Sequence, residues 1–252
     1  MVPRAARGGP VFCIYYTHME LQRGDPELED LNKALNDPEL LENYKRPYDN
    51  YQVSIVPKIL GNILVWFGNI VYGKRPSYLK FRAVEVIARV PYQSWSSAAY
   101  TLLTLFYKNQ KKAMALANVT KYARLAQDNE TMHVVVISHL AQKHARAGFI
   151  RYTCIPLVFA FFYFWSSYLL YLLNRRYSYE LNYLFESHAF SQYSEFLITH
   201  EEELKDRAMV SDFLEWYGRY PRSEYEFFQS VRNDEIIHRN TSIKEIEIRN
   251  AL

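Results

Sequence analysis

Two short motifs in the sequence carry residue types that bind metal ions. Glu-x-x-His occurs as Glu130/His133 and again as Glu235/His238. Three residues along a helix advance about 300° and about 4.5 Å, so the Glu and the His of each motif project from one face. A carboxylate and an imidazole at that spacing are candidates to hold one ion. A single copy arises easily by chance, whereas two copies in one helical chain are a stronger signal.

Each motif also follows a single candidate for an inward-facing Glu: Glu85 precedes the first motif and Glu186 the second. The two separations are similar, each about the length of a helix, a loop and a helix. Di-iron and di-manganese bundles take one Glu from each of two helices and Glu-x-x-His from each of the other two. We therefore predict an all-α, ferritin-like four-helix bundle whose metal ligands are Glu85, Glu130, His133, Glu186, Glu235 and His238.

The charges of this set favour two divalent ions. Four carboxylates facing one apolar interior are costly unless they keep protons or meet cations. Two divalent ions carry a total charge of about +4, which balances the charge of −4 on the four carboxylates. One neutral histidine is then left to bind each ion. Mixed oxygen and imidazole ligands suit iron or manganese better than zinc. Asn129 and Asp234, next to Glu130 and Glu235, are candidates to hydrogen-bond to the histidines and fix their tautomers.

The competing interpretation is that all six residues form ordinary buried ion pairs. For Glu85 this alternative has named partners, because Arg82 and Arg89 lie three residues before and four residues after it on the same helix.

Composition agrees with a helical chain of 252 residues. There are 22 Tyr and 15 Phe but only 8 Gly, which favours long helices over a sheet with many tight turns. A net charge of +3 is too small to indicate a nucleic-acid partner. Cys13 and Cys154 form neither a disulfide framework nor a zinc motif, which points to a reducing compartment. The first 19 residues carry Arg4 and Arg7 and no acid, which leaves a targeting peptide open.

The ligands must be positioned by helices, which the apolar periodicity predicts. Residues 1–50 are expected to form an N-terminal arm with short helices starting at Pro26 and Pro38, each preceded by a capping Asp. Residues 51–246 form the di-iron bundle domain and 247–252 a C-terminal tail. Pro91 is expected to break or kink its helix. The long helices are predicted at 51–72, 79–90, 94–107, 112–146, 152–174, 177–199 and 223–246.

Two of these segments suit a membrane. Residues 152–174 contain no charge and are long enough to cross a bilayer. A single crossing would place the first motif and Glu186 on opposite sides of about 30 Å of hydrocarbon. We therefore predict a monotopic protein, bound in one leaflet but not spanning it. For residues 51–72, which include Trp66, a core-packed helix and a helix in the membrane interface both remain open.

Longer motifs around these residues resemble a known family. The segments are 85–92 (EVIARVPY), Asn129-Glu130-x-x-His133, 186–190 (ESHAF) with Tyr193, and Asp234-Glu235-x-x-His238. They are similar to the alternative oxidases, and most of all to the plastid terminal oxidase branch. The resemblance runs from about Gly61 to Thr241 and does not cover residues 1–50.

The resemblance implies a monotopic quinol oxidase that uses two Fe ions, held by the six residues above, to pass electrons from plastoquinol or ubiquinol to O₂. The products are quinone and water, and no protons are pumped. Tyr193 matches a tyrosine thought to supply an electron or hydrogen atom, and the positions near the quinol are Lys80, Val84, His188 and Gln192.

This sequence departs from the usual pattern at a few of these positions. Lys80 stands where Arg is usual, and Val84 and Val86 flank Glu85 where Leu and Thr are commoner. Lys keeps the charge but lacks the planar fork of Arg, which bears on the preferred quinone. A plastid thylakoid membrane fits best, and a mitochondrial inner or bacterial membrane also fits. A homodimer is compatible with these patterns.

Three other functions compete with this expectation. A di-iron hydroxylase or desaturase acting on a lipid or quinone would use the same ligands and leave an oxygen atom or a double bond in its substrate. An iron-storage cage would be soluble, which the apolar faces at 53–72 and 152–173 disfavour. A membrane scaffold with decayed metal binding would bind less than about one iron per chain.

Overall fold

The computed structural model describes residues 25–250, with the backbone alone for the last two of them. The targeting peptide and Cys13 considered above therefore lie outside the described residues. The described chain is helical apart from one isolated bridge between Ala208 and Ser223, which confirms the predicted all-α class. The helices are α1 (Pro26–Ala34), α2 (Pro38–Lys45), α3 (Ile55–Tyr72), α4 (Tyr78–Ala88), α5 (Val90–Phe106), α6 (Gln110–His144), α7 (Ile155–Leu173), α8 (Arg175–Thr199), α9 (Glu201–Asp206), α10 (Asp212–Tyr217) and α11 (Glu224–Asn250).

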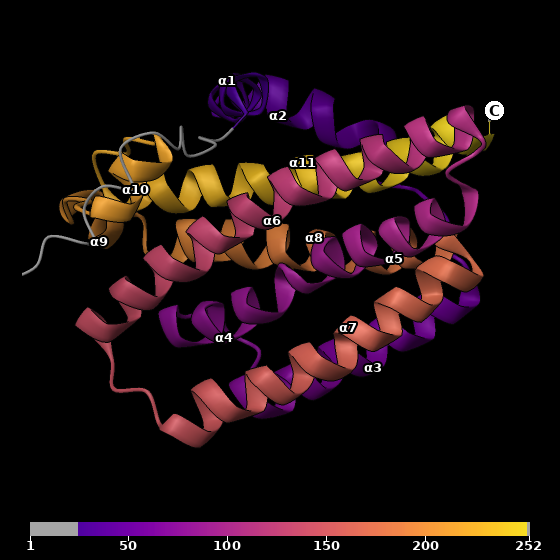
Figure 1. Cartoon of the computed structure of the whole chain (residues 1–252). Coiled ribbons are helices and arrows are strands. Elements are labelled where there is room, and N and C mark those ends of the chain that lie inside the picture. The colour runs from indigo at the N-terminus through magenta and orange to yellow at the C-terminus, as the bar shows by residue number, and fades with distance from the viewer. Residues whose placement is uncertain (1–24, 251–252) are drawn as a thin grey trace, which may run out of the picture.

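Four helical rods run side by side through the middle of the molecule: α4 with α5, α6, α8 and α11 (Figure 1). The first rod is broken, because α4 ends at Ala88 and α5 begins at Val90 with Pro91 in its first turn. Proline has no backbone N–H to donate and is well placed at the start of a helix. The break predicted at Pro91 is therefore present, and the two halves still form one side of the bundle.

The helices mostly start and stop where the sequence predicts. Asp25 and Asp37 accept hydrogen bonds from backbone N–H groups in the first turns of α1 and α2, each of which begins with the expected proline. α11 continues to Asn250, beyond the predicted end at Ile246 and into the expected tail. No Gly or Pro interrupts residues 247–250, so nothing in the sequence stops the helix there.

The segment at residues 25–50 packs against α11 (Figure 1). Arg239 of α11 donates to Asp49 Oδ1 over 2.8 Å and to the carbonyl of Lys45 over 2.7 Å. Asn240 Nδ2 donates to the carbonyl of Tyr44 over 2.7 Å. Residues 25–50, the described part of the predicted arm, are thus held on the bundle by hydrogen bonds from α11.

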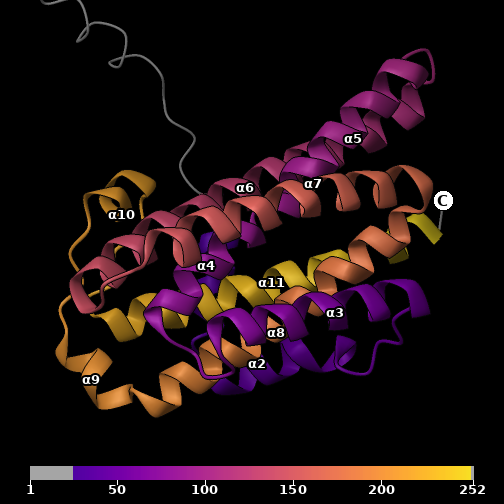
Figure 2. The same cartoon turned by 90° about the horizontal axis from the view of Figure 1, so that it is seen from below.

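α3 and α7 lie together on the other side of the bundle (Figures 1 and 2). They meet through the rings of Phe67 and Phe159, whose centroids are 4.9 Å apart. Among the described helices, α3 and the stretch 150–173, which joins a π-helical turn (Ile150–Cys154) to α7, are long and apolar enough to cross a membrane. α7 buries Tyr163, Ser167 and Tyr171 at helical spacing.

The opposite faces of α3 and α7 expose large apolar side chains. They are Ile59, Ile63, Trp66 and Ile70 on α3, and Phe161, Phe162, Trp165 and Leu169 on α7. So many large apolar side chains exposed on two neighbouring helices are uncommon on a protein that meets only water, and they mark an interaction site. For α3 the exposure favours the membrane-interface alternative over the core-packed one.

Candidate metal centre

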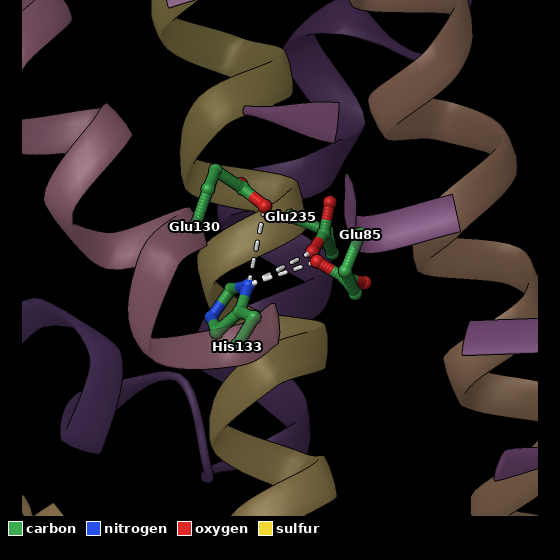
Figure 3. A group of neighbouring side chains, drawn as sticks. All are labelled: Glu85, Glu130, His133 and Glu235. Atoms are coloured by element: carbon green, nitrogen blue, oxygen red, sulfur yellow. Dashed lines mark ion pairs between the residues drawn. The ribbon is translucent and has the colours of Figure 1, made fainter. Parts of the chain in front are cut away.

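Four helices deliver the six predicted ligands to one place in the bundle. Glu85 comes from α4, the first Glu-x-x-His motif from α6, Glu186 from α8 and the second motif from α11. All six residues are buried, none more than 4% exposed. Four of them are drawn in Figure 3, where they converge from three helices. Each motif does place its Glu and His on one face, as the helical spacing requires.

The six residues form two overlapping groups that could each hold an ion. One group is Glu85, Glu130, His133 and Glu235; the other is Glu130, Glu186, Glu235 and His238. Within each group, one ligand atom from every residue lies within 4.8 Å of the others. Glu130 and Glu235 belong to both groups. The geometry therefore offers two adjacent sites that share a pair of carboxylates, with one histidine at each site.

His133 directs Nδ1 at three carboxylates. This nitrogen lies 3.4 Å from Glu130 Oε2, 3.5 Å from Glu85 Oε2 and 3.6 Å from Glu235 Oε1 (Figure 3). His238 Nδ1 lies 2.8 Å from Glu130 Oε1.

Several of these buried atoms have no hydrogen-bond partner among the described residues. They are Glu85 Oε2, both carboxylate oxygens of Glu130 and of Glu235, and Nδ1 of both histidines. Buried polar atoms are nearly always satisfied, so a cluster of orphans aimed at one space indicates a missing partner. Divalent cations would satisfy them, and carboxylate oxygens with imidazole nitrogens suit iron. The donor set therefore fits the two iron ions expected from the sequence.

Electrostatics in the cluster support the same interpretation. Burial raises the pKa of Glu85 to about 7 and raises that of Glu235 well above its usual value. Burial also opposes ionisation of Glu130, but the positive charges of His133 and His238 beside it outweigh the effect of burial and hold its pKa at about 2. Without cations, then, the carboxylates differ in their tendency to keep a proton, as expected for like charges crowded in an apolar interior.

The ion-pair alternative for Glu85 does not match its contacts. Its carboxylate accepts a short hydrogen bond from Tyr193 Oη and faces His133, rather than Arg82 or Arg89. The ring of Tyr193 stacks on Phe81, with centroids 4.1 Å apart.

Glu186 has two partners that the sequence analysis missed. Tyr92 Oη donates to Glu186 Oε1 over 2.6 Å, and Asn182 Nδ2 donates to the same oxygen over 3.0 Å. Asn182 lies four residues before Glu186 on α8, so helical spacing could have revealed it. Tyr92 lies on α5, beyond the break that ends α4 after Glu85. Helical spacing from a predicted ligand therefore could not place it.

Of the two candidates for fixing the histidine tautomers, Asp234 contacts His133 directly and Asn129 contacts Asp234. Asp234 Oδ2 lies 2.8 Å from His133 Nε2. Asn129 donates to Asp234 Oδ2 over 3.1 Å and to Tyr217 Oη over 3.3 Å, so its connection to the histidine passes through Asp234. Arg219, which sequence reasoning did not select, donates to Asp234 as well.

A cavity of about 110 Å³ lies between the metal cluster and the two apolar helices. Its walls include Phe159 and Tyr163 of α7, several residues of α3, and Glu85, Glu186 and Tyr193. The four positions that the resemblance placed near a quinol all line this cavity: Lys80, Val84, His188 and Gln192.

Lys80 is the cation in the cavity wall. Its Nζ donates to Gln192 Oε1 over 2.6 Å, to the carbonyl of Lys74 over 2.9 Å and to Asn69 Oδ1 over 3.3 Å. Burial lowers the pKa of Lys80, and burial followed by the charge of Lys80 lowers the pKa of His188.

Comparison with known proteins gives a consistent result. The family model described as alternative oxidase matches residues 61–245, which include all six candidate ligands. Ubiquinol oxidase 4, chloroplastic/chromoplastic, from Arabidopsis thaliana is 26% identical over 185 residues. The aligned region covers 66% of this chain and 50% of that protein, so the chain spans about half the length of this relative. The resemblance found in the sequence is confirmed: the chain belongs to the alternative oxidase family.

Proposed function

We propose that the protein is a quinol:O₂ oxidoreductase, which oxidises plastoquinol or ubiquinol to the quinone and reduces O₂ to water. One observation carries the proposal: the buried carboxylate–histidine cluster shares a wall with an apolar cavity. Glu85 and Glu186 belong to both, and Tyr193, which also lines the cavity, donates a hydrogen bond to Glu85. A lipid-soluble reductant bound in this cavity would lie against the metal ligands without meeting bulk water.

Alternative oxidases are membrane-associated, and the surface of this chain suits that location. The cavity lies between the bundle and the helices α3 and α7, whose exposed faces are apolar. We propose that these two helices lie in one leaflet with the bundle above them. Quinol would then enter between them from the hydrocarbon.

The residues have separate roles in this proposal. Glu85, Glu130, His133, Glu186, Glu235 and His238 would hold two iron ions, which supply the electron storage and the O₂ chemistry when bound. Lys80 and Gln192 are paired at the cavity wall and would orient the oxygen atoms of the quinol headgroup. His188, whose pKa is lowered, is available in its neutral form to accept a hydroxyl proton from quinol.

Tyr193 is placed to connect the cavity and the cluster. Its hydroxyl donates a hydrogen bond to Glu85, and burial followed by the charge of Glu85 raises its pKa well above the usual value. The hydroxyl therefore stays protonated at neutral pH. It can deliver that hydrogen, with or without an electron, toward the cluster.

Oxygen uptake tests the proposal. The iron-loaded protein in lipid vesicles should consume O₂ when ubiquinol or plastoquinol analogues are added, with cyanide present to silence haem oxidases. The quinone formed should keep the mass of the quinol less two hydrogens. A mass gain of one oxygen would show a hydroxylase instead, and no uptake with iron bound would overturn the oxidase function.

Two finer points belong to the same proposal. The relative from Arabidopsis is named as chloroplastic or chromoplastic, and we propose a plastid thylakoid membrane for this chain. The ratio of uptake rates with the two quinols, in the native chain and in Lys80→Arg, would show whether Lys80 sets the preference. A homodimer remains a prediction, which sedimentation in detergent would test.

A further inference from the structure

A buried series of polar contacts runs from α1 to the outer nitrogen of His133. His133 Nε2 lies 2.8 Å from Asp234 Oδ2, while Nδ1 faces the carboxylates of the cluster. In the neutral imidazole that binds an ion through Nδ1, the ring proton is on Nε2, which donates it to Asp234. The lone pair of Nδ1 is then left free for an ion. The orientation of Asp234 therefore decides how well His133 can act as a ligand.

Asp234 is held by donors from three further residues. Asn32 Nδ2 donates to Oδ1 over 2.6 Å, and Asn129 Nδ2 donates to Oδ2 over 3.1 Å. Arg219 donates to both oxygens, over 2.6 Å to Oδ2 and 3.2 Å to Oδ1. The side-chain torsion that turns a carboxylate is broad and soft, so its orientation is set by such partners. Here the donors hold Oδ2 toward His133.

α1 supplies two of the residues in this series. Asn32 uses its other N–H to reach the carbonyl of Ser230 over 2.7 Å, which fixes its amide. Glu29 accepts two hydrogen bonds from Arg219, from Nη2 over 2.6 Å and from Nε over 3.0 Å. Arg219 is thus held between Glu29 on one side and Asp234 on the other. Such two-point pairs of Arg with a carboxylate fix geometry more strictly than single contacts.

Both α1 residues precede the region that matches the family, 61–245. We infer that Glu29 and Asn32 are positioning residues of the metal centre, which act through Arg219 and Asp234 to keep His133 oriented toward a bound ion. The inference rests on the metal assignment within the proposed function and is independent of the quinol.

Ferrous-iron affinity, measured by competition with a coloured chelator, tests the inference. The variants are Asn32→Leu, which keeps the size of the side chain, and Glu29→Gln, which keeps its shape. Exposed neighbours on the same helix give matched controls, Lys33→Leu and Glu27→Gln. We expect each α1 variant to weaken binding by up to about tenfold, the low end for residues that support a ligand. The controls should match the unsubstituted protein.

The absorption spectrum of the cobalt-substituted protein gives a second measurement. It reports the ligands and their geometry, and it should change in Asn32→Leu and Glu29→Gln but not in the controls. A variant that merely loosened α1 would lower the unfolding temperature of the metal-free protein and leave this spectrum intact. That outcome would contradict the inference.

Combining these substitutions with Asp234→Asn distinguishes an effect that passes through Asp234 from a general loosening of α1. Asp234→Asn should itself weaken iron binding by about tenfold or more. If Glu29 and Asn32 act through Asp234, their substitution should cause no further loss in that background. A further loss of equal size would overturn the inference and leave the proposed function standing. Failure of the unsubstituted protein to bind iron would overturn both.

Discussion

At the scale of single residues, Glu130 is a carboxylate that lies between the two candidate ion sites. It belongs to both candidate ion sites and faces both histidines, with Nδ1 of His238 at 2.8 Å and Nδ1 of His133 at 3.4 Å. Neither of its oxygens has a hydrogen-bond partner among the described residues. Both oxygens are therefore available to the two proposed ions.

We predict that Glu130→Ala abolishes both iron binding and oxygen uptake, because each ion loses the same shared ligand. Glu130→Gln, which keeps the shape of the side chain, should also bind less than the full complement of iron. Iron content by elemental analysis and oxygen consumption with quinol are the measurements. Glu202→Ala, at an exposed position on α9, is the control. Full activity in Glu130→Ala would show that the ligand assignment is wrong.

Tyr193 should separate binding from turnover. Its hydroxyl contacts Glu85, but its ring is held by stacking on Phe81, so Tyr193→Phe keeps the packing. We predict that this variant retains its iron while oxygen consumption collapses, because the hydrogen at Oη is no longer available. Iron content and uptake rate are measured on the same sample. A parallel loss of both would mean that the role of the hydroxyl is structural.

The residues that sequence reasoning found and missed differ in a physical way. Glu130 and His133 share one helix face, and that periodicity is written in the sequence. Tyr92 and Arg219 reach the site from beyond a helix break and from the connection between α10 and α11, where no period relates them to the ligands. Only the packing of distant segments brings them to the site.

At the scale of the elements, helix starts were predictable because caps and prolines act locally. Asp25 and Asp37 each satisfy N–H groups of the next turn whatever the rest of the chain does. The docking of α1 and α2 on α11 was not predictable. It depends on contacts between residues about two hundred positions apart, such as Asn32 with Asp234. Short amphipathic helices carry no signal of which neighbour they will cover.

The contact between α3 and α8 depends on a glycine. A Cβ placed on Gly61 would lie 3.0 Å from Leu184 Cδ1 and 3.5 Å from Leu181 Cδ1, both on α8. A larger side chain must push these leucines or separate the helices. Gly68 lies about two turns further toward the end of α3. A Cβ placed there would have nothing within 4 Å.

We therefore predict that Gly61→Leu destabilises the protein by about 1–3 kcal/mol, the usual cost of overpacking. That corresponds to a fall in unfolding temperature of about 5 °C for a chain of this size. Gly68→Leu should not lower the unfolding temperature, since it removes a helical glycine without a clash. Thermal unfolding in detergent, followed by circular dichroism, gives the comparison. Equal destabilisation by both variants would mean that α3 is not held closely against α8.

At the scale of the whole molecule, the position of the metal cluster constrains how the protein meets the bilayer. Glu130 lies before α7 in the chain and Glu186 after it, yet both belong to one group of ligands. A bilayer core about 30 Å thick could not separate them. The bundle itself exposes charged side chains such as Lys121 on α6, so it does not suit hydrocarbon. We therefore predict that the molecule rests on the membrane by its α3 and α7 face.

Thiol labelling in sealed vesicles tests this orientation. Cys13 and Cys154 are first replaced by Ser, and single cysteines are then placed at Lys121 on α6 or Glu202 on α9, both exposed. If α3 and α7 lie in one leaflet, a membrane-impermeant reagent should label both positions from the same side. Vesicles opened with detergent should label both positions in every case and serve as the control.

A crossing by α7 predicts the opposite result, whether or not α3 crosses as well. If α7 alone spans the bilayer, or if α3 and α7 both do, the segment with Lys121 and the segment with Glu202 lie on opposite sides. One position would then be protected in sealed vesicles while the other is labelled. That pattern would divide the ligands of α6 from those of α8 and α11, and no single centre could hold two ions between them.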